Sequence, residues 1–321
     1  RTGRRAGARA PEKRFLIKPR VGQAAQPKVG VGMEIRSVSD FMTECFRLSY
    51  RNGRADTIYY RGAHQIYPEA TRHIPSIYHP EFGFIGKERE IFDEIVSIFP
   101  AEMLAQKTTV EKLILMQHYR FPTRIMDASP NPLAGLFFAC FDDGNAETMK
   151  KDGIVCRYKV EEHEIKTCDS DTVTVVANIA RCKSGFLGDK DFSKMSREDF
   201  NKTDAAGELH FEINKEQPGF HQSIVPAHLY RVLCLRPRMN NPRVIRQEGR
   251  FFLFGISGRS KAGCAKFPRE WLREPVIIPA GSKKRILDEL DSMGLNEGFF
   301  YPDFEHVSRV VRERFRKKDH S

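Results

Sequence analysis

The sequence lacks any apolar run approaching the ~18 residues that a membrane-spanning helix requires, and no apolar signal-peptide core stands near its start. Its 7 Cys are scattered, and no two of them form a C-x-x-C pair, so their spacing gives a zinc site little support. An odd number of scattered thiols is typical of a reducing compartment. The composition therefore predicts a cytoplasmic protein with no metal site and no membrane partner.

Positive charge is abundant, but most of it stands in one segment. Residues 1–32 hold nine Lys and Arg against one Glu, a net +8, which leaves +3 of the total +11 for the rest of the chain. This segment shows no apolar periodicity, so we expect a disordered tail, either a non-native leader or a basic arm that binds phosphate backbones. Its deletion should shift the melting temperature by less than about two degrees. We expect one folded domain at 33–312 and a basic C-terminal tail at 313–321.

Apolar periodicity and end signals define the expected elements. Helices are predicted at 37–50, 87–99, 108–119, 132–141, near 199–216, at 283–293 and from 302 onward, where Phe304, Val307, Val311 and Phe315 should face inward. Strands are predicted at 57–60, 153–160, 230–235, 250–254 and 276–278. Thr108 with Glu111 fits a capping box, Ser282 fits a helix cap, and Gly294 a helix end. Helices that come early and at the C-terminus around a mixed, mainly antiparallel sheet indicate an α+β fold.

The most informative segment is residues 117–127, a polar turn between two apolar helices. It places His118, Arg124 and Asp127 close together, and Asn131 after it fits a helix N-cap. One interpretation is structural: Arg124 and Asp127 pair and make the turn rigid, while His118 ends a helix. The other is that these polar groups line a cleft, because loops held between rigid elements often carry function.

Two further segments carry residues suited to ligand chemistry. Arg61 follows Tyr60 at the end of a predicted strand, and its planar fork suits a phosphate or carboxylate that Gly62 would let approach closely. Gln247 and Glu248 enter the strand at 250–254, where alternation lets only one of them point at a given cleft. Each segment has an ordinary structural alternative, a salt bridge beside a turn or a polar pair at a strand edge.

Together these segments resemble the FRG domain family, named for a Phe-Arg-Gly motif. The resemblance rests on Tyr60-Arg61-Gly62, Gln117-His118-Tyr119, Pro122-Thr123-Arg124, Asp127, Asn131-Pro132 and Gln247 with Gly249 and Phe251. It continues through residues 173–180, 241–245, 294–296 and 300–303, and it covers about residues 37–312. The sequence departs from the family pattern at several positions: Tyr60 replaces Phe, residues 120–121 replace Gly-Leu, and residues 128–129 replace Trp-Thr.

The order of these motifs is in turn similar to that of ADP-ribosyltransferases, which implies an ADP-ribosyltransferase-like fold. Carried over, the resemblance implies that Arg61 fixes the pyrophosphate of NAD, Ser129 orients the reacting ribose, and Gln247 hydrogen-bonds its hydroxyls. Tyr60, Gly62, Arg124 and Asp127 would line the NAD site. Gln cannot act as a base at pH 7. Glu248 or His118 would therefore supply one if the acceptor needs deprotonation. Ser129 is poorly spaced from Asp127 for a nucleophilic triad.

The implied function is ADP-ribosyl transfer from NAD, used as a substrate, to a protein or nucleic-acid acceptor. Such an enzyme could serve as a toxin or phage-defence effector with a neutralising antitoxin as its partner. Two alternatives stay open: a non-enzymatic nucleotide or nucleic-acid binding module, and an NAD glycohydrolase.

Overall fold

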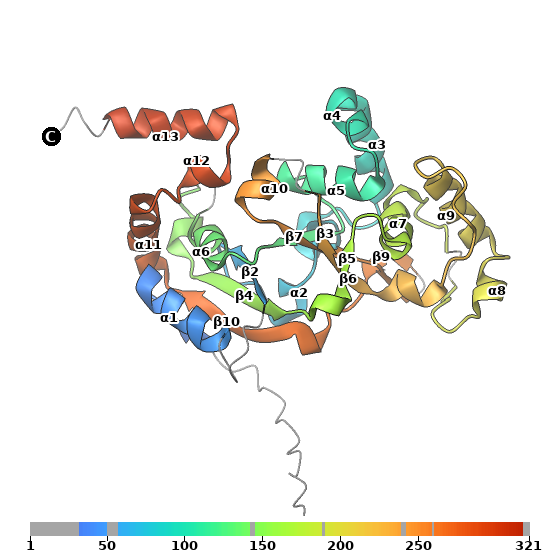
Figure 1. The fold of residues 1–321 in the computed structure, drawn as a ribbon, viewed down its shortest axis with the longest axis horizontal. Helices are drawn as coiled ribbons and strands as arrows, with labels where there is room; N and C mark the ends of the chain where they lie inside the picture. The colour runs from blue at the N-terminus through green and yellow to red at the C-terminus, as the bar shows by residue number, and fades with distance from the viewer. Residues whose placement is uncertain are drawn as a thin grey trace, which may run out of the picture.

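The computed structural model of the chain describes residues 32–49, 57–141, 145–187, 190–238, 242–258 and 260–316. Among these residues, helices surround two four-stranded sheets and a short hairpin (Figure 1). The expected tail at 1–32 lies almost entirely outside the described residues. The expected domain end at 312 falls inside the last helix, because that helix runs through Arg316.

The two sheets are mixed but mainly antiparallel, as the sequence predicts. The first has the order β1 (Met33–Glu34), β10 (Leu272–Ile278), β4 (Gly153–Lys159), β2 (Ile58–Ala63). The second has the order β3 (Ile125–Ala128), β7 (Arg250–Phe254), β6 (Val232–Arg236), β5 (Ile165–Thr167). Only the pairs β1–β10 and β5–β6 are parallel among the described strands. The hairpin is formed by β8 (Ile256–Ser257) and β9 (Ser260–Cys264).

A two-residue bridge joins the sheets where β2 passes the end of β3. The Tyr60 N–H donates to the Ser129 carbonyl at 2.7 Å, and the Ser129 N–H donates back to the Tyr60 carbonyl at 2.9 Å. A shared apolar core fills the space between the sheets, with Tyr59 and Tyr158 from the first and Phe252 from the second. Because alternate side chains of a strand face opposite ways, Arg61 lies on the same face of β2 as Tyr59.

The helices of the described residues lie around the two sheets. They are α1 (Val38–Ser49), α2 (Glu69–Arg72), α3 (Glu88–Ile98), α4 (Pro100–Leu104), α5 (Thr109–His118), α6 (Pro132–Cys140), α7 (Asp171–Asn178), α8 (Arg197–Phe200), α9 (Asp204–Asn214), α10 (Pro242–Arg246), α11 (Ala280–Ser292), α12 (Glu297–Phe300) and α13 (Phe304–Arg316). One apolar core joins α1, α6 and α11 to the first sheet, and another joins α3, α5, α7 and α9 to the second.

Glycines let α6 pack directly on the first sheet. A Cβ on Gly62 would lie 2.1 Å from the Gly135 carbonyl oxygen of α6, and one on Gly153 would lie 2.1 Å from that of Ala139. Gly62 therefore stands within β2 because a helix backbone crosses it there. The expected turn at Gly62 is wrong, because this residue lies within a strand, but Gly62 does line the cavity described below.

The helix-end signals have mixed outcomes. The capping box of Thr108 with Glu111 is confirmed, and the Asn131 side chain accepts from the Leu133 N–H at the start of α6. Ser282 is not a cap, because α11 already begins at Ala280 after Pro279. Gly294 does follow α11, at a φ of +79°.

The last helix does not turn its valines inward. In Figure 1, α13 extends away from the body, and the side chains of Val307 and Val311 are 38% and 44% exposed. Phe304 and Phe315 have side chains outside the described set. The amphipathic pattern of α13 is real, but the described residues hold no core beneath its valines.

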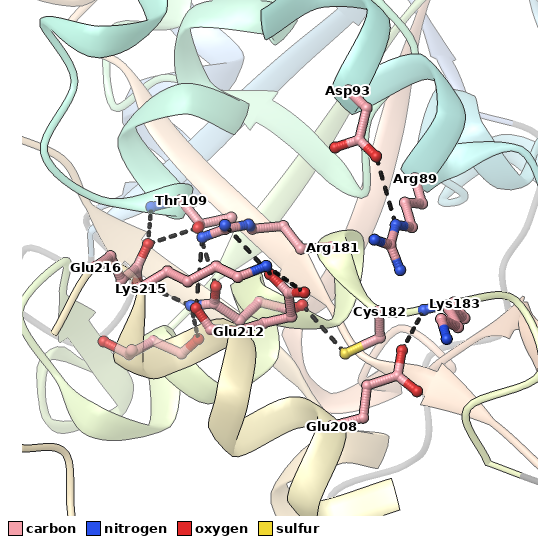
Figure 2. A network of polar contacts seen from close by, with 12 residues as sticks. Arg89, Asp93, Thr109, Arg181, Cys182, Lys183, Glu208, Glu212, Lys215 and Glu216 are labelled. Carbon is pink, nitrogen blue, oxygen red and sulfur yellow. Dashed lines mark hydrogen bonds and ion pairs between the residues drawn. The ribbon is translucent and has the colours of Figure 1, made fainter. Parts of the chain in front are cut away.

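A polar network fixes the start of α5, the helix that delivers the central motif (Figure 2). Glu216 accepts hydrogen bonds from the N–H and the hydroxyl of Thr109, both at 2.5 Å. Nearby, Glu212 pairs with Arg181 at 3.2 Å and with Lys215 at 2.7 Å. A carboxylate at a helix N-terminus satisfies unbonded N–H groups and suits the helix dipole. This end of α5 is therefore held by α9 and the residues after it.

Candidate functional site

A cavity of about 320 Å³ opens beside the junction of the two sheets. It is within the ~300–1,000 Å³ range of typical ligand pockets. The polar residues that line it are Arg61, His64, Thr71, Arg72, Ser76, His79, Gln117, His118, Arg120, Asp127, Arg243 and Gln247. Four of them are arginines, and Asp127 is the one acidic residue among the described lining residues. The cavity is therefore suited to an anionic ligand that also has a positively charged part.

Arg61 enters the cavity from β2. Its Nε atom is buried and has no hydrogen-bond partner among the described residues. Burial alone would lower the pKa of Arg61, but the Asp127 carboxylate nearby raises it above its ordinary value. Buried donors without a partner are rare in folded proteins. An arginine in this state is a strong candidate for binding a ligand oxygen.

Asp127 lies on β3, and a chain of side-chain hydrogen bonds orients its carboxylate. The Gln117 amide N–H donates to Asp127 Oδ1 at 3.1 Å, and the Gln117 carbonyl oxygen accepts from the Thr123 hydroxyl at 2.7 Å. Thr123 is completely buried. Gln117 therefore has no freedom to flip, and it holds one carboxylate oxygen in place.

His118 is the last residue of α5 and lines the same cavity. Its Nε2 atom is buried without a hydrogen-bond partner among the described residues. Burial, with a smaller contribution from Arg243, lowers the pKa of His118 to about 4, although Asp127 opposes the shift. The imidazole is therefore neutral at pH 7. A neutral imidazole has one donor and one acceptor nitrogen.

Sequence reasoning missed an arginine cluster at another part of the cavity. Arg120 donates to the Tyr301 hydroxyl at 3.1 Å, and the Arg243 guanidinium lies 4.4 Å from the centre of the Tyr301 ring. Arg243 also donates to the His118 carbonyl oxygen. Arg120 has a φ of +61°, a conformation that few non-glycine residues adopt. The family resemblance covers these positions, but nothing in the sequence shows that they meet, because they come from three distant segments.

The expected Arg124–Asp127 pair is wrong. Arg124 is completely buried and pairs with Glu88 of α3, with Nε 2.8 Å from Glu88 Oε1 and Nη2 on Oε2. Its Nη1 donates to the Phe254 carbonyl oxygen at 3.0 Å. Arg124 does not line the cavity, so its expected place in an NAD site is also a correction. Asp127 alone of the expected pair reaches the cavity.

Three other expected site residues lie away from the cavity. Ser129 is 5% exposed, and its hydroxyl accepts from the Asn131 N–H at 2.9 Å. Tyr60 is buried on the opposite face of β2 from Arg61, with its ring 6.2 Å from that of Phe41. Glu248 is exposed, at a φ of +49°. These placements correct the expectation that all three act on a common ligand.

Gln247 does line the cavity, from the turn after α10. Its amide N–H donates to the Phe300 carbonyl oxygen at 2.9 Å. A separate cavity of about 10 Å³, large enough for about one water molecule, is lined by Gln247, Asp127 and Ser129 among others. Asp127, Gln247 and Phe138 line both cavities and so separate Ser129 from the main site.

Comparison with protein families agrees with the resemblance seen in the sequence. Residues 56–148 match the family model of the FRG domain, so the chain carries an FRG domain. This match covers β2 to α6 and includes Arg61, His118 and Asp127 of the cavity. Comparisons with curated proteins and with solved structures gave no match.

No group of three or more His, Cys, Asp or Glu side chains among the described residues is arranged to hold a metal ion. No helix in the described part of the chain is both long enough and apolar enough to cross a membrane.

Proposed function

We propose that the cavity binds NAD and that the protein transfers ADP-ribose from NAD to a macromolecular acceptor. One observation carries this proposal: Arg61 and the acid Asp127 share a cavity with His118 and Gln247, and the Arg61 Nε has no partner among the described residues. NAD combines an anionic pyrophosphate with a cationic nicotinamide. A guanidinium fork binds phosphate oxygens well, and a carboxylate attracts the cationic end.

Asp127 is placed for the bond-breaking step. The bond between the ribose carbon and the nicotinamide nitrogen breaks, nicotinamide leaves with the bonding electrons as a neutral molecule, and positive charge develops on the ribose. A fixed carboxylate stabilises such an oxocarbenium-like state, as in glycoside hydrolysis. Gln117 holds one oxygen of Asp127. The Gln247 amide can hydrogen-bond a ribose hydroxyl as the charge grows.

The acceptor must lose a proton as its new bond to the ribose carbon forms. His118 is a basic group suited to this step, because it lines the cavity and is neutral at pH 7. Its low pKa makes it a weak base. His118 therefore suits an acceptor that loses its proton late, after the oxocarbenium has formed. Glu248, the other candidate base, is outside the cavity.

One observation favours the alternative of a binding module without catalysis. The Ser129 hydroxyl already accepts a hydrogen bond from Asn131 and lines only the small cavity, so it does not join Arg61 around one ligand. A module of this kind would use Arg61 and its neighbours to hold a nucleotide. NAD hydrolysis, with water as the acceptor, uses the same residues as transfer.

Incubation with NAD separates these functions. Release of nicotinamide together with label on protein or nucleic acid supports transfer, release without label supports hydrolysis, and binding without release supports the module. Absence of both binding and release refutes the proposal.

Arg61→Lys tests the proposed phosphate contact, because Lys keeps the charge but loses the bidentate fork. It should weaken NAD binding in calorimetry about tenfold, or about 1.4 kcal/mol. Gln247→Ala should mainly lower turnover, because its hydrogen bond strengthens in the transition state. Arg285→Lys on α11 is a matched control, since Arg285 is 67% exposed and outside the cavity. An Arg61→Lys variant that binds NAD like this control would remove Arg61 from the site.

A further inference from the structure

An aromatic wall forms one side of the cavity, and the proposed chemistry leaves it unexplained. The His79 ring stacks on Phe82 with 4.5 Å between centroids and an interplanar angle of 26°. The edge of Tyr67 meets the same imidazole at 5.2 Å and 71°. All three residues line the cavity. The stacking holds the imidazole in one orientation, and Phe82 remains 42% exposed, so its ring can receive a flat ligand.

His79 itself is in an unusual state for a structural residue. Its side chain is only 4% exposed, yet both ring nitrogens lack hydrogen-bond partners among the described residues. Leaving buried polar atoms unpaired is costly, and native structures contain few such atoms. Burial lowers the pKa of His79, and Arg61 lowers it further against the opposing effect of Glu81. At pH 7 the ring is neutral and has a donor and an acceptor to satisfy.

Arg61 interacts with both the aromatic wall and the Asp127 carboxylate. Arg61 is close enough to His79 to affect its charge state, and close enough to Asp127 to be affected by it. Arg72 adds a second positive charge near the wall, because its Nε donates to the Tyr67 carbonyl oxygen at 3.1 Å. A cationic ring is disfavoured beside two arginines, whereas a neutral ring is not. The Asp127 carboxylate, in contrast, favours a cationic ring over a neutral one.

We infer that the cavity fixes the direction of the dinucleotide, with the adenine base on the wall of Tyr67, His79 and Phe82 and the nicotinamide ribose at Asp127. The pyrophosphate then lies at Arg61, between the two ends, in the order in which these groups are joined in NAD. One nitrogen of His79 hydrogen-bonds the base or its ribose, and Phe82 stacks on the base. This inference rests on the proposed binding of NAD and adds a subsite to it.

Three ligands test the direction of binding. ADP-ribose contains adenosine, the pyrophosphate and the second ribose but no nicotinamide. Nicotinamide mononucleotide contains nicotinamide, its ribose and one phosphate but no adenosine, and NAD contains all of these groups. Each is titrated by calorimetry against the parent and the variants Phe82→Ala and His79→Phe. Phe82→Ala should weaken NAD and ADP-ribose about tenfold, near the lower end of the range for aromatic stacking on a base. Binding of nicotinamide mononucleotide should stay within about twofold.

Two further variants make the test specific. Phe211→Ala removes an exposed phenyl ring (62% exposed) from α9, outside the cavity, and should change none of the three affinities. His79→Phe keeps the aromatic ring and loses the nitrogens, so it should reproduce the loss for ADP-ribose with the wall intact. Asp127→Asn should show the converse pattern, weakening nicotinamide mononucleotide and NAD more than ADP-ribose, which keeps the second ribose but lacks the cationic ring.

The outcomes separate this inference from the function on which it rests. If NAD binds and the wall variants weaken nicotinamide mononucleotide more than ADP-ribose, the direction is reversed and the inference is overturned alone. If NAD binds and the wall variants change no affinity, the wall is not a base subsite. If the parent binds none of the three ligands, the proposed function fails and this inference fails with it.

Discussion

Replacing Glu88 should destabilise the protein far more than replacing Asp127, although Asp127 is closer in sequence to Arg124. The Arg124 guanidinium is completely buried and the Glu88 carboxylate is 5% exposed. Burial would lower the pKa of Arg124, and the Glu88 charge reverses this and raises it above its ordinary value. Glu88→Gln removes that charge and leaves a buried cation beside the Phe254 carbonyl oxygen and the face of the Tyr78 ring, neither of which is charged. Breaking a buried pair in this way costs about 3–5 kcal/mol.

The size of the expected shift in melting temperature follows from the length of the chain. An unfolding entropy of about 2.1 cal/mol/K per residue gives roughly 0.7 kcal/mol/K for 321 residues. A loss of about 3–5 kcal/mol therefore lowers the melting temperature by about 4–7 °C. Asp127→Asn keeps the shape of a half-exposed side chain, so it should cost less than about 1 kcal/mol.

Calorimetry and urea unfolding of both variants test this reasoning, with Asp93→Asn as the control. Asp93 forms an exposed pair with Arg89 one turn along α3, at 3.4 Å, and its loss should cost no more than about 0.5 kcal/mol. A double variant, Glu88→Met with Arg124→Met, should recover part of the lost stability because it leaves no buried charge. The assignment of the pair is refuted if Glu88→Gln is as stable as the control, or if Asp127→Asn is the more damaging change.

Two further predictions concern stability. Burial raises the pKa of Glu44, but hydrogen bonds from Arg47 and Arg157 outweigh this and lower it below its ordinary value of 4.5. The stabilising effect of the Glu44 carboxylate is therefore complete above pH 4.5 and is lost as the pH falls through its lower, folded-state pKa. Urea unfolding at several pH values should show that Glu44→Gln loses less stability in acid than the parent does. Parallel curves of stability against pH would contradict this. Lys283 is completely buried and donates to two backbone carbonyl oxygens at 2.6 and 3.0 Å. Lys283→Met should lower the free energy of unfolding by about 3 kcal/mol in thermal unfolding. Lys284→Met is the control, because Lys284 is 81% exposed, and it should lower it by less than about 0.5 kcal/mol. Equal melting temperatures for the two variants would refute the role of Lys283.

The sequence predicts the helices next to the cavity well because their signals act over a few residues. Thr108 and Glu111 fix the start of α5, and Asn131 fixes the start of α6, through contacts within one turn. The strand β7 is also found at its predicted bounds, Arg250–Phe254. Local chemistry is sufficient for these elements, since each carries its own end signal or a strongly apolar pattern.

The strand β3 could not be found in this way. It is four residues long, and its partner β7 begins more than a hundred positions later in the chain. The polar residues around it indicate a turn, and in a turn Arg124 and Asp127 would meet. In an extended chain, residues three apart point to opposite sides. The missed strand therefore explains the wrong ion pair, and it explains why only Asp127 reaches the cavity.

The arginines of the cavity were missed for a related reason. Arg72, Arg120 and Arg243 belong to segments that meet only when the chain is folded. Each alone is an ordinary basic residue, in a chain whose net charge is dominated by its first 32 residues. Their convergence depends on α10 and on Tyr301, which the family resemblance covers but to which the sequence assigns no role. A cavity of this kind is a property of the tertiary structure.

The bridge between Tyr60 and Ser129 is what brings the proposed phosphate and ribose contacts together. In an antiparallel pairing, one step forward from Tyr60 corresponds to one step back from Ser129. This order places Ala128 opposite Arg61 and Asp127 opposite Gly62. Arg61 and Asp127 both line the cavity, and the Asp127 charge raises the pKa of Arg61. Ser129 acts in this junction through its backbone N–H and carbonyl, while its hydroxyl serves the start of α6. A hydroxyl at position 129 is thus required by the local fold rather than by a ligand, and Ser129→Ala should weaken stability more than it weakens NAD binding.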